Sequence, residues 1–374
     1  MRSFARHILL TATWLYSGLL LAWFGLHWLY ADQLWWLALL NAFVPWFFLP
    51  LVILIPLQLL LRNTPAAFAL LAALLLFLLL YGQLFVPTRL RTPALHTPVL
   101  RVMSFNIWGG SHTQETAQVI ADNQFPDLVA LQELPPDMAD LLVQQFSTLY
   151  PYRLLKAGYG NHGMGILSRY PLTVLDSTAL TDPAWAVQVV QVAAPGHLFT
   201  FYNVHPHGTN ILLYWQEGVS VRANVAQSYQ ARLRFAQKLL GDIQQRSGPI
   251  LVAGDFNSTD QSAVYQQITT QLLDAHRAAG WGFGHTFPAY QGSFHGLPIP
   301  ARLMRIDMLF YTGGFQAIDQ HVSPTSGESD HLPIVATLQQ QVAPWHNGLL
   351  QGIRARCAIM TELMQRADVE RAKR

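Results

Sequence analysis

The chain has 374 residues and a formal net charge of +2, with 51% hydrophobic and only 12% charged residues, about half the usual charged share. Its single cysteine excludes an internal disulfide. Residues 102–343 carry 11 Lys and Arg against 17 Asp and Glu, a net of −6, so this region lacks the basic surplus by which nucleic-acid-binding domains hold phosphates.

The first 86 residues predict a membrane anchor. Their only Asp, Glu, Lys or Arg residues are Arg2, Arg6, Asp32 and Arg62. Three apolar stretches follow one another, Ile8–Tyr30, Leu34–Leu61 and Pro65–Val86. Each is long enough for the ~20 apolar residues that cross a bilayer. The first run is too long for a cleaved signal peptide, and no A-x-A-like site follows it. Three prolines in the second stretch predict a kinked or broken helix.

The arginines of the anchor indicate its orientation. Arg2 and Arg6 precede the first stretch, and Arg62 lies between the second and the third. By the positive-inside rule, the amino terminus and the Arg62 loop are cytoplasmic. Three spans then place everything after Val86 outside the cytoplasm. Two spans with a cytoplasmic catalytic domain remain the alternative, because Arg89, Arg91 and Arg101 favour it.

A change of pattern marks the remaining organisation. Residues 87–98 contain three prolines and no periodicity, which predicts a linker; residues 99–343 alternate short strands with helices and loops, which predicts a two-sheet α/β domain. The predicted strands are Val99–Ile107, Asp127–Gln132, Gly163–Ser168, Val187–Val192, Leu198–Val204, Pro249–Ala253, Met304–Phe310 and Leu332–Leu338, and one long helix covers Val221–Gln245. Residues 344–374 predict a basic amphipathic tail, which either lies on a membrane surface or packs on its own domain.

Polar residues recur at the ends of the predicted strands: Asn106, Glu133, His205, Asp255, Asn257, Asp307, Asp330 and His331. Strand ends on one rim of a sheet converge on one site. Most of these residues, taken singly, are equally typical of turns or solvated strand ends. Asp307 is not, because a charge among Ile, Met, Leu and Phe must be exposed or paired.

Seven segments, in this order, resemble the endonuclease/exonuclease/phosphatase superfamily, also called the deoxyribonuclease-like fold: Val102–Trp108, Asp127–Glu133, Gly163–Arg169, Asn203–His205, Gly254–Ser258, Arg305–Asp307 and Ser329–His331. The resemblance covers about residues 99–338. It implies an α/β four-layer αββα sandwich, with two packed, mostly antiparallel sheets flanked by helices, here preceded by three transmembrane helices.

The resemblance also implies roles for the polar residues. Glu133 is the main ligand of a magnesium ion, which Mn²⁺ can replace, and Asn106 and Asp330 assist it. Asp255 orients or deprotonates the attacking water, and Asn257 holds a phosphoryl oxygen. His331 binds or protonates the phosphate, while Asp307 fixes its tautomer and favours its charged form.

His205 narrows the resemblance to one group of relatives. Abasic-site endonucleases usually have Tyr at this point, whereas His is similar to deoxyribonucleases, sphingomyelinases and inositol-polyphosphate phosphatases. Some of these nucleases pair the histidine with a Glu near the Gly163 strand. Here that segment is Gly160–Gly163 and contains no carboxylate, so no acidic side chain fixes the orientation of His205.

The anchor favours a phosphorylated lipid in the membrane as the substrate. Three spans followed by this domain resemble the bacterial teicoplanin-resistance membrane proteins, which implies a bacterial inner-membrane phosphohydrolase acting on an undecaprenyl pyrophosphate-like carrier from the periplasmic side. A sphingomyelinase or phospholipase C-like diesterase is a variant of this hypothesis. The alternatives are a deoxyribonuclease-like nuclease, disfavoured by the missing basic surplus, and an inactive scaffold, disfavoured because every expected catalytic position is filled.

Overall fold

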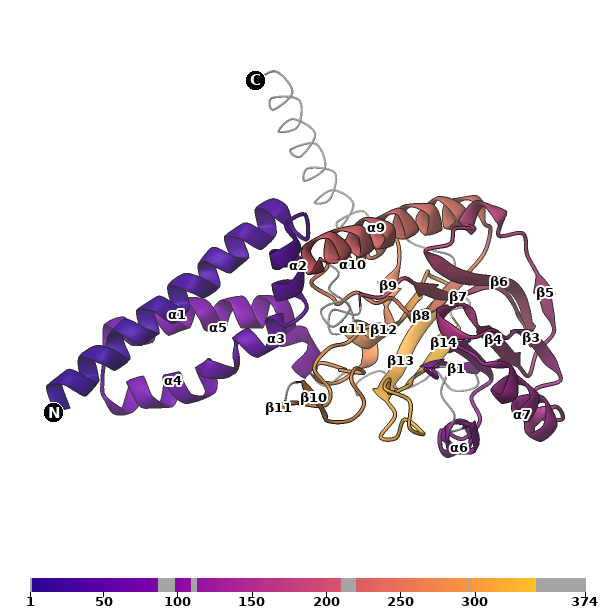
Figure 1. The fold of residues 1–374 in the computed structure, drawn as a ribbon, viewed down its shortest axis with the longest axis horizontal. Helices are drawn as coiled ribbons and strands as arrows, with labels where there is room; N and C mark the ends of the chain where they lie inside the picture. The colour runs from indigo at the N-terminus through magenta and orange to yellow at the C-terminus, as the bar shows by residue number, and fades with distance from the viewer. Residues whose placement is uncertain (1, 87–97, 109–112, 210–219, 295, 341–374) are drawn as a thin grey trace, which may run out of the picture.

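The computed structural model describes residues 2–86, 98–108, 113–209, 220–294 and 296–340. Residues 87–97 of the predicted linker and the predicted tail lie outside these ranges. The described chain forms a bundle of apolar helices and a layered α/β domain beside it (Figure 1).

The anchor consists of α1 (Arg2–Tyr30), α2 (Trp35–Asn41), α3 (Val44–Phe47), α4 (Leu49–Leu60), α5 (Thr64–Tyr81) and the 3-10 helix η1 (Gly82–Phe85). Two helices, Arg6–Tyr30 and Thr64–Phe85, are long and apolar enough to cross a membrane. The α2 and α3–α4 segments make a third candidate span if they are counted together, although they are bent by 75° at their break. The predicted second stretch is therefore broken.

The prolines explain how the second stretch divides. Pro45 and Pro50 stand in the first turns of α3 and α4, where a missing N–H costs no helical hydrogen bond. Only Pro56 lies inside a helix. The chain returns through α4 to the end of the bundle where α1 begins, so the start of α1 and the α4–α5 turn lie far from the α/β domain (Figure 1).

Two mixed sheets of six strands form the α/β domain. One sheet has the order β13-β14-β1-β2-β4-β3, with β1 (Val99–Asn106), β2 (Leu128–Gln132), β3 (Tyr152–Lys156), β4 (Met164–Ser168), β13 (Phe315–Val322) and β14 (Ile334–Gln340). The other has the order β5-β6-β7-β8-β12-β9, with β5 (Leu172–Val174), β6 (Trp185–Ala194), β7 (His197–Pro206), β8 (Ile250–Asp255), β9 (Leu273–Asp274) and β12 (Asp307–Tyr311). Only β1–β2 and β7–β8 run parallel among these pairs.

The helices cover the outer faces of the sheets. Along β1, Leu100 and Val102 face the core between the sheets, while Met103 and Phe105 pack with α6 (Thr113–Asp122) and α7 (Pro136–Phe146). α9 (Val221–Gln245) and α10 (Ala263–Ile268) cover the second sheet. The remaining elements are α11 (Ala275–Ala279), the hairpin β10 (Gly292–Phe294) and β11 (Leu297–Ile299), and the 3-10 turns η2 (Gly160–His162) and η3 (Thr178–Leu180). The predicted αββα sandwich is confirmed.

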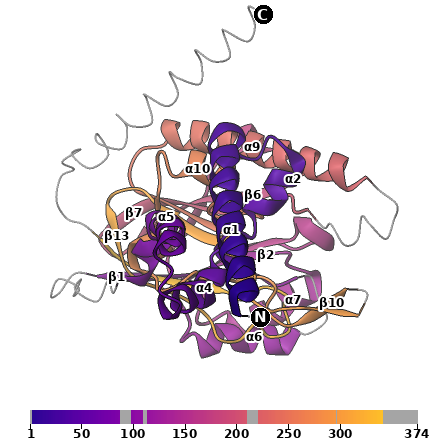
Figure 2. The ribbon, with the colours of Figure 1, turned by 90° about the vertical axis from the view of Figure 1, so that its left-hand side faces the viewer.

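The helical bundle packs against the end of the α/β domain (Figure 2). Oδ2 of Asp32, in the turn after α1, accepts a hydrogen bond of 2.8 Å from the first backbone N–H of α10, that of Ala263. The Trp46 indole donates to the carbonyl of Leu303 (2.9 Å), and Gln83 Nε2 donates to the carbonyl of Arg277 (3.0 Å). Phe283 contacts the rings of Tyr81 and Phe85. The contacts therefore involve α10, α11 and the loop before β12.

The predicted helix Val221–Gln245 begins and ends where α9 does, and each predicted strand overlaps an observed one. The prediction for Met304–Phe310 was wrong at its start, because the backbone of Met304 pairs with Phe287 and the strand begins at Asp307. The sequence analysis missed β3, β5, β9, β10, β11 and β13.

Candidate active site

Strand pairing brings the predicted polar residues to one end of the sandwich. β1 and β2 run parallel with Asn106 opposite Gln132, so Asn106 and Glu133 end neighbouring strands. In the facing sheet, Asp307 at the start of β12 is paired in register with Asp255 at the end of β8. Gly254 allows β7 to lie close against β8, because a Cβ there would meet the Val204 carbonyl oxygen of β7 at 1.9 Å.

His331 and Asp307 form a buried pair. Nδ1 of His331 lies 2.9 Å from Oδ2 of Asp307, and its Nε2 lies 3.7 Å from Oδ2 of Asp255. Burial lowers the pKa of His331, but the carboxylates of Asp307 and Asp255 outweigh it and raise that pKa to about 10. The imidazole is thus a cation at neutral pH, held with Nε2 toward Asp255.

Asp255 lies at the centre of the cluster. Its Oδ2 accepts hydrogen bonds from Nδ2 of Asn106 (3.1 Å) and of Asn257 (3.2 Å), and its Oδ1 accepts from the Asn257 backbone N–H (2.8 Å). Burial raises the pKa of Asp255, while the nearby His331 and His205 lower it in part. A buried carboxylate with a raised pKa accepts a proton more readily than an exposed one.

His205 has a fixed orientation despite the absence of a carboxylate partner. Its Nδ1 donates to the backbone carbonyl of Asn161 (3.0 Å), because a carbonyl oxygen can only accept. Nε2 then faces the acidic cluster, 3.5 Å from Oε1 of Glu133 and 3.6 Å from Oδ2 of Asp255. His205 and His331 therefore present their Nε2 atoms to the same carboxylate.

Asn106 joins the carboxylates of the two sheets. Its Nδ2 donates to Oε1 of Glu133 (3.1 Å) and to Oδ2 of Asp255, while its Oδ1 accepts from the backbone N–H of Trp108 (2.9 Å). Glu133 and Trp108 have positive φ angles of 55° and 54°, which costs about 1–2 kcal/mol for residues other than glycine. Backbone strain of this kind gathers at functional sites.

The acidic residues fit a divalent cation. Ligand atoms of Asp255, Asp307 and His331 all lie within 4.8 Å of one another, which is consistent with a metal site. Oδ1 of Asp330 and Oδ1 of Asp307 are buried and have no hydrogen-bond partner among the described residues. Burial, opposed by His331 and reinforced by Glu133, raises the pKa of Asp330 to about 6. Oxygen ligands of this kind suit hard cations.

A comparison with protein families decides the identity of this fold and site. The family model described as Endonuclease/Exonuclease/phosphatase family matches residues 103–331, which is more than half of the chain. The chain belongs to this family. It is an α/β phosphoesterase of that family, and the comparison with curated proteins finds no match.

Several solved structures are similar to this chain at low sequence identity. An endonuclease/exonuclease/phosphatase from Bacteroides vulgatus is 21% identical, covering 65% of this chain and 100% of its own, with a TM-score of 0.49. Truncated TDP2 from Caenorhabditis elegans is 20% identical, with coverages of 64% and 98% and a TM-score of 0.47. A family protein from Bacteroides thetaiotaomicron is 16% identical, with coverages of 68% and 99% and a TM-score of 0.48.

The family site has supporting residues that sequence analysis did not select. Ser329 Oγ donates to the carbonyl of Asn106 (2.7 Å) and accepts from the backbone N–H of His331 (3.0 Å). The Phe287 ring lies 4.9 Å from that of His331. Ser329 precedes Asp330 in a segment that matches the family, and this adjacency was the available signal. Phe287 ends the aromatic segment Trp281–Phe287 that precedes Asp307 in the sequence, and this clustering of aromatic residues was its signal.

Arg232 on α9 is a second residue that sequence analysis missed. Its Nη1 donates to the carbonyl of His207 (3.2 Å) and to Oγ1 of Thr209 (2.9 Å) in the segment after His205. Burial lowers the pKa of Arg232 to about 10, partly offset by Asp32 and Asp255. Arg232 is thus a buried cation whose charge is felt by Asp32 of the anchor and by the catalytic Asp255. In sequence it resembles the exposed Arg234 of the same helix.

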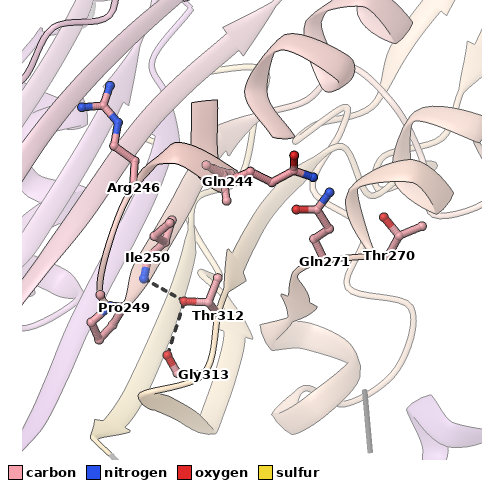
Figure 3. A pocket seen from close by; sticks show the side chains of 10 residues that line it. Gln244, Arg246, Pro249, Ile250, Thr270, Gln271, Thr312 and Gly313 are labelled. Carbon is pink, nitrogen blue, oxygen red and sulfur yellow. Dashed lines mark hydrogen bonds between the residues drawn. The ribbon is translucent and has the colours of Figure 1, made fainter. Parts of the chain in front are cut away.

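A separate pocket of about 470 Å³ lies beside the start of β8 (Figure 3). Its lining includes Gln244, Gln271 and Thr312, whose hydroxyl accepts from the Ile250 backbone N–H (2.8 Å). Arg246 also lines it and is paired with Asp242 at 3.0 Å. None of the described residues that line it is a carboxylate or a histidine, and these are the groups that phosphoester hydrolysis requires.

Proposed function

We propose that this chain is a membrane-anchored, magnesium-dependent phosphohydrolase of the inner membrane of a bacterium. Its substrate is a phosphorylated lipid, either a phosphate ester or a pyrophosphate of the undecaprenyl pyrophosphate type. The catalytic domain works on the periplasmic or extracellular side. The arrangement of a membrane anchor and this domain is similar to that of the teicoplanin-resistance membrane proteins.

The contact between the anchor and the α/β domain carries this proposal. Asp32, Trp46 and Gln83 each make a hydrogen bond to the domain, and Thr259, four residues after the catalytic Asp255, donates to the carbonyl of Asn41 (3.4 Å). A domain held in this way works at the membrane surface. A substrate that itself resides in the membrane is the one that benefits from such a placement.

The charge of the domain supports a lipid over a nucleic acid. Residues 102–343 have a net charge of −6, whereas non-specific binding to DNA comes almost entirely from neutralising phosphates with Lys and Arg. A single phosphate or pyrophosphate group requires only a local set of cations and donors. His331, Arg232 and Asn257 provide such a set.

The proposed chemistry assigns a role to each residue. Asp255 accepts the proton of the attacking water, helped by the burial that raises its pKa. His331, held by Asp307, donates a proton or a hydrogen bond to a phosphoryl or leaving oxygen. Nε2 of His205 faces the same point. Asn257 Nδ2 is held by its bond to the Pro206 carbonyl (3.0 Å), and its second hydrogen, which bonds to Oδ2 of Asp255 (3.2 Å), is exchanged to a phosphoryl oxygen when substrate binds.

Glu133 and Asp330 are the proposed ligands of Mg²⁺, and Asn106 positions Glu133. Nδ1 of His331 is bonded to Oδ2 of Asp307 (2.9 Å), so we assign this pair to proton transfer, although its ligand atoms also lie within reach of a metal held beside Asp255. When bound, Mg²⁺ or Mn²⁺ neutralises negative charge on the phosphoryl oxygens. The buried Oδ1 of Asp330 supports this assignment, because it accepts no hydrogen bond from the described residues and has only the distant Nε2 of His331 (3.9 Å) as a charged neighbour.

One experiment tests the proposed function. The full chain is purified in detergent with Mg²⁺ and offered undecaprenyl pyrophosphate, sphingomyelin and plasmid DNA, beside an Asp255→Ala control. We expect phosphate release from the pyrophosphate alone, abolished by Asp255→Ala. Cleavage of sphingomyelin would make the protein a lipid diesterase. Cleavage of DNA without lipid hydrolysis would overturn the proposal in favour of a deoxyribonuclease-like nuclease.

A further inference from the structure

The membrane anchor contains an apolar groove. It has a volume of about 440 Å³ and lies between α3–α4 and α5, within the range of about 300–1,000 Å³ that is usual for small-molecule sites. Every described residue that lines it is apolar or aromatic, including Val52, Ile55, Leu74 and Phe77. Val52 is 70% exposed, so the groove opens on the outer surface of the bundle.

The groove continues onto the catalytic domain. Phe283, from the loop before β12, lines its end, and so does Trp46 of α3. The Trp46 indole donates to the Leu303 carbonyl (2.9 Å), and the Leu303 N–H donates to the Phe287 carbonyl (2.8 Å). The Phe287 ring lies against His331. Two hydrogen bonds thus connect a wall of the groove to the residue that packs on the catalytic histidine.

The distance between groove and site suits a lipid. Phe283 and Phe287 are four residues apart, so their Cα atoms are separated by at most about 14 Å. One leaflet of a bilayer has about half of the ~30 Å hydrocarbon thickness, which is a similar length. A lipid whose phosphate lies at His331 therefore has enough chain to enter the groove near Phe283.

We propose that the α4–α5 groove binds the hydrocarbon chain of the lipid phosphate whose headgroup is hydrolysed at the catalytic site. This inference rests on the proposed function and adds a recognition site for the chain. Burial of hydrocarbon against Ile55, Leu74 and Phe77 contributes binding free energy away from the phosphate. Substrates with the same headgroup are then distinguished by their chains.

The test uses one substitution that fills the groove and one that does not. Leu74→Trp places an indole in the groove, whereas Leu79→Trp makes the same change on the outer face of α5, where Leu79 is 74% exposed and does not line the groove. The full chain is assayed in detergent with Mg²⁺ on undecaprenyl pyrophosphate and on isopentenyl pyrophosphate, which shares the headgroup but has a five-carbon chain.

We expect Leu74→Trp to raise KM for undecaprenyl pyrophosphate by about tenfold or more, because a few methylenes in a pocket are worth at least that factor. Its kinetics on isopentenyl pyrophosphate should match wild type, which also verifies that the variant is folded. Leu79→Trp should match wild type on both substrates. Equal KM values for the two variants on the long substrate would overturn the proposal.

A binding measurement separates this inference from the proposed function. Radiolabelled undecaprenyl pyrophosphate is added to the Asp255→Asn protein with and without Leu74→Trp, and the retained label is counted. If the wild type hydrolyses neither pyrophosphate but Leu74→Trp abolishes retention, the proposed function fails and the groove stands. If the wild type hydrolyses the lipid and Leu74→Trp changes neither KM nor retention, the groove fails and the function stands.

Discussion

The Nδ1 atom of His205 lies 3.0 Å from the backbone carbonyl oxygen of Asn161. This contact replaces the carboxylate that some relatives place near the Gly163 strand. The Asn161 side chain is exposed, so only the path of the backbone through η2 is required. The imidazole is held in the tautomer that leaves Nε2 facing Glu133 and Asp255.

The first prediction follows from this backbone contact. Asn161→Ala should retain activity within about twofold, because the carbonyl is unchanged and exposed substitutions usually have small effects. His205→Asn should lower kcat by about 10²–10⁴-fold, the usual contribution of a positioned acid or base. Steady-state kinetics on the hydrolysed lipid measure both. A large loss in Asn161→Ala would show that the side chain, not the carbonyl, positions His205.

The second prediction concerns Asp307, whose carboxylate is a main cause of the raised pKa of His331. As a proton donor, His331 is active below its pKa of about 10 and inactive above it. Asp307→Asn removes the charge, so the basic limb of the kcat/KM profile should move to lower pH. Profiles from about pH 6 to about pH 11 test this. An unchanged basic limb, whatever the loss in rate, would mean that His331 is not the acid.

Much of this site could be predicted because the fold places it at strand ends. Asn106, Asp255 and His205 each follow an apolar run that is buried on both sides, and such runs are visible in a sequence. The edge strands β5 and β13 were missed because they are short or half exposed and lack a clear alternation. Element boundaries are less predictable for the same reason.

Contacts between distant segments could not be predicted. Arg232 is one arginine among several in α9, and only the fold brings its charge within reach of Asp32 and Asp255. Trp46 and Leu303 are 257 residues apart. Their hydrogen bond depends on how the anchor docks, which no local pattern encodes. The orientation of His205 was likewise invisible, since a backbone carbonyl carries no sequence signature.

The third prediction concerns metal removal and Asp330. The pKa of its carboxyl is raised to about 6, so without metal the folded protein binds this proton more tightly than the unfolded chain does. Above about pH 6 the buried, ionised Asp330 lowers the free energy of unfolding. This penalty is relieved as the pH falls through 6 and the carboxyl group is protonated. Mg²⁺ competes with the proton, so its affinity should decline below about pH 6.

Thermal unfolding with EDTA or Mg²⁺ measures this effect. The wild type should gain Tm with Mg²⁺ at neutral pH, because a ligand that binds only the folded state stabilises it. Asp330→Asn should raise the Tm of the metal-free protein and respond less to Mg²⁺. The matched control is Asp319→Asn, because the Asp319 side chain is exposed. A full Mg²⁺ response in Asp330→Asn would remove Asp330 from the ligand set.

The fourth prediction concerns the junction of anchor and domain. Asp32 accepts from Nδ2 of Asn41 (2.6 Å) and from the backbone N–H of Ala263 (2.8 Å). Asp32→Ala leaves the Ala263 N–H without this acceptor, at a cost of about 1–3 kcal/mol for an unsatisfied buried group, while Asn41 Nδ2 loses one acceptor and keeps its bond to the Ala31 carbonyl (3.1 Å). Tm in detergent should fall, and cleavage by protease between anchor and domain should accelerate. Asp122→Ala, at an exposed position, should change neither; equal behaviour of the two variants would refute the role of this junction.

The fifth prediction concerns orientation. The start of α1 and the α4–α5 turn, which carry the arginines of the anchor, lie at the end of the bundle away from the catalytic domain (Figure 1). If that end is cytoplasmic, the catalytic domain is outside.

Tyr159, which is 82% exposed, is replaced by cysteine in a Cys357→Ala background, which removes the only native thiol. A membrane-impermeant maleimide should label this cysteine in intact spheroplasts as fully as in lysed ones. Labelling only after lysis would place the catalytic domain in the cytoplasm and overturn the proposed orientation.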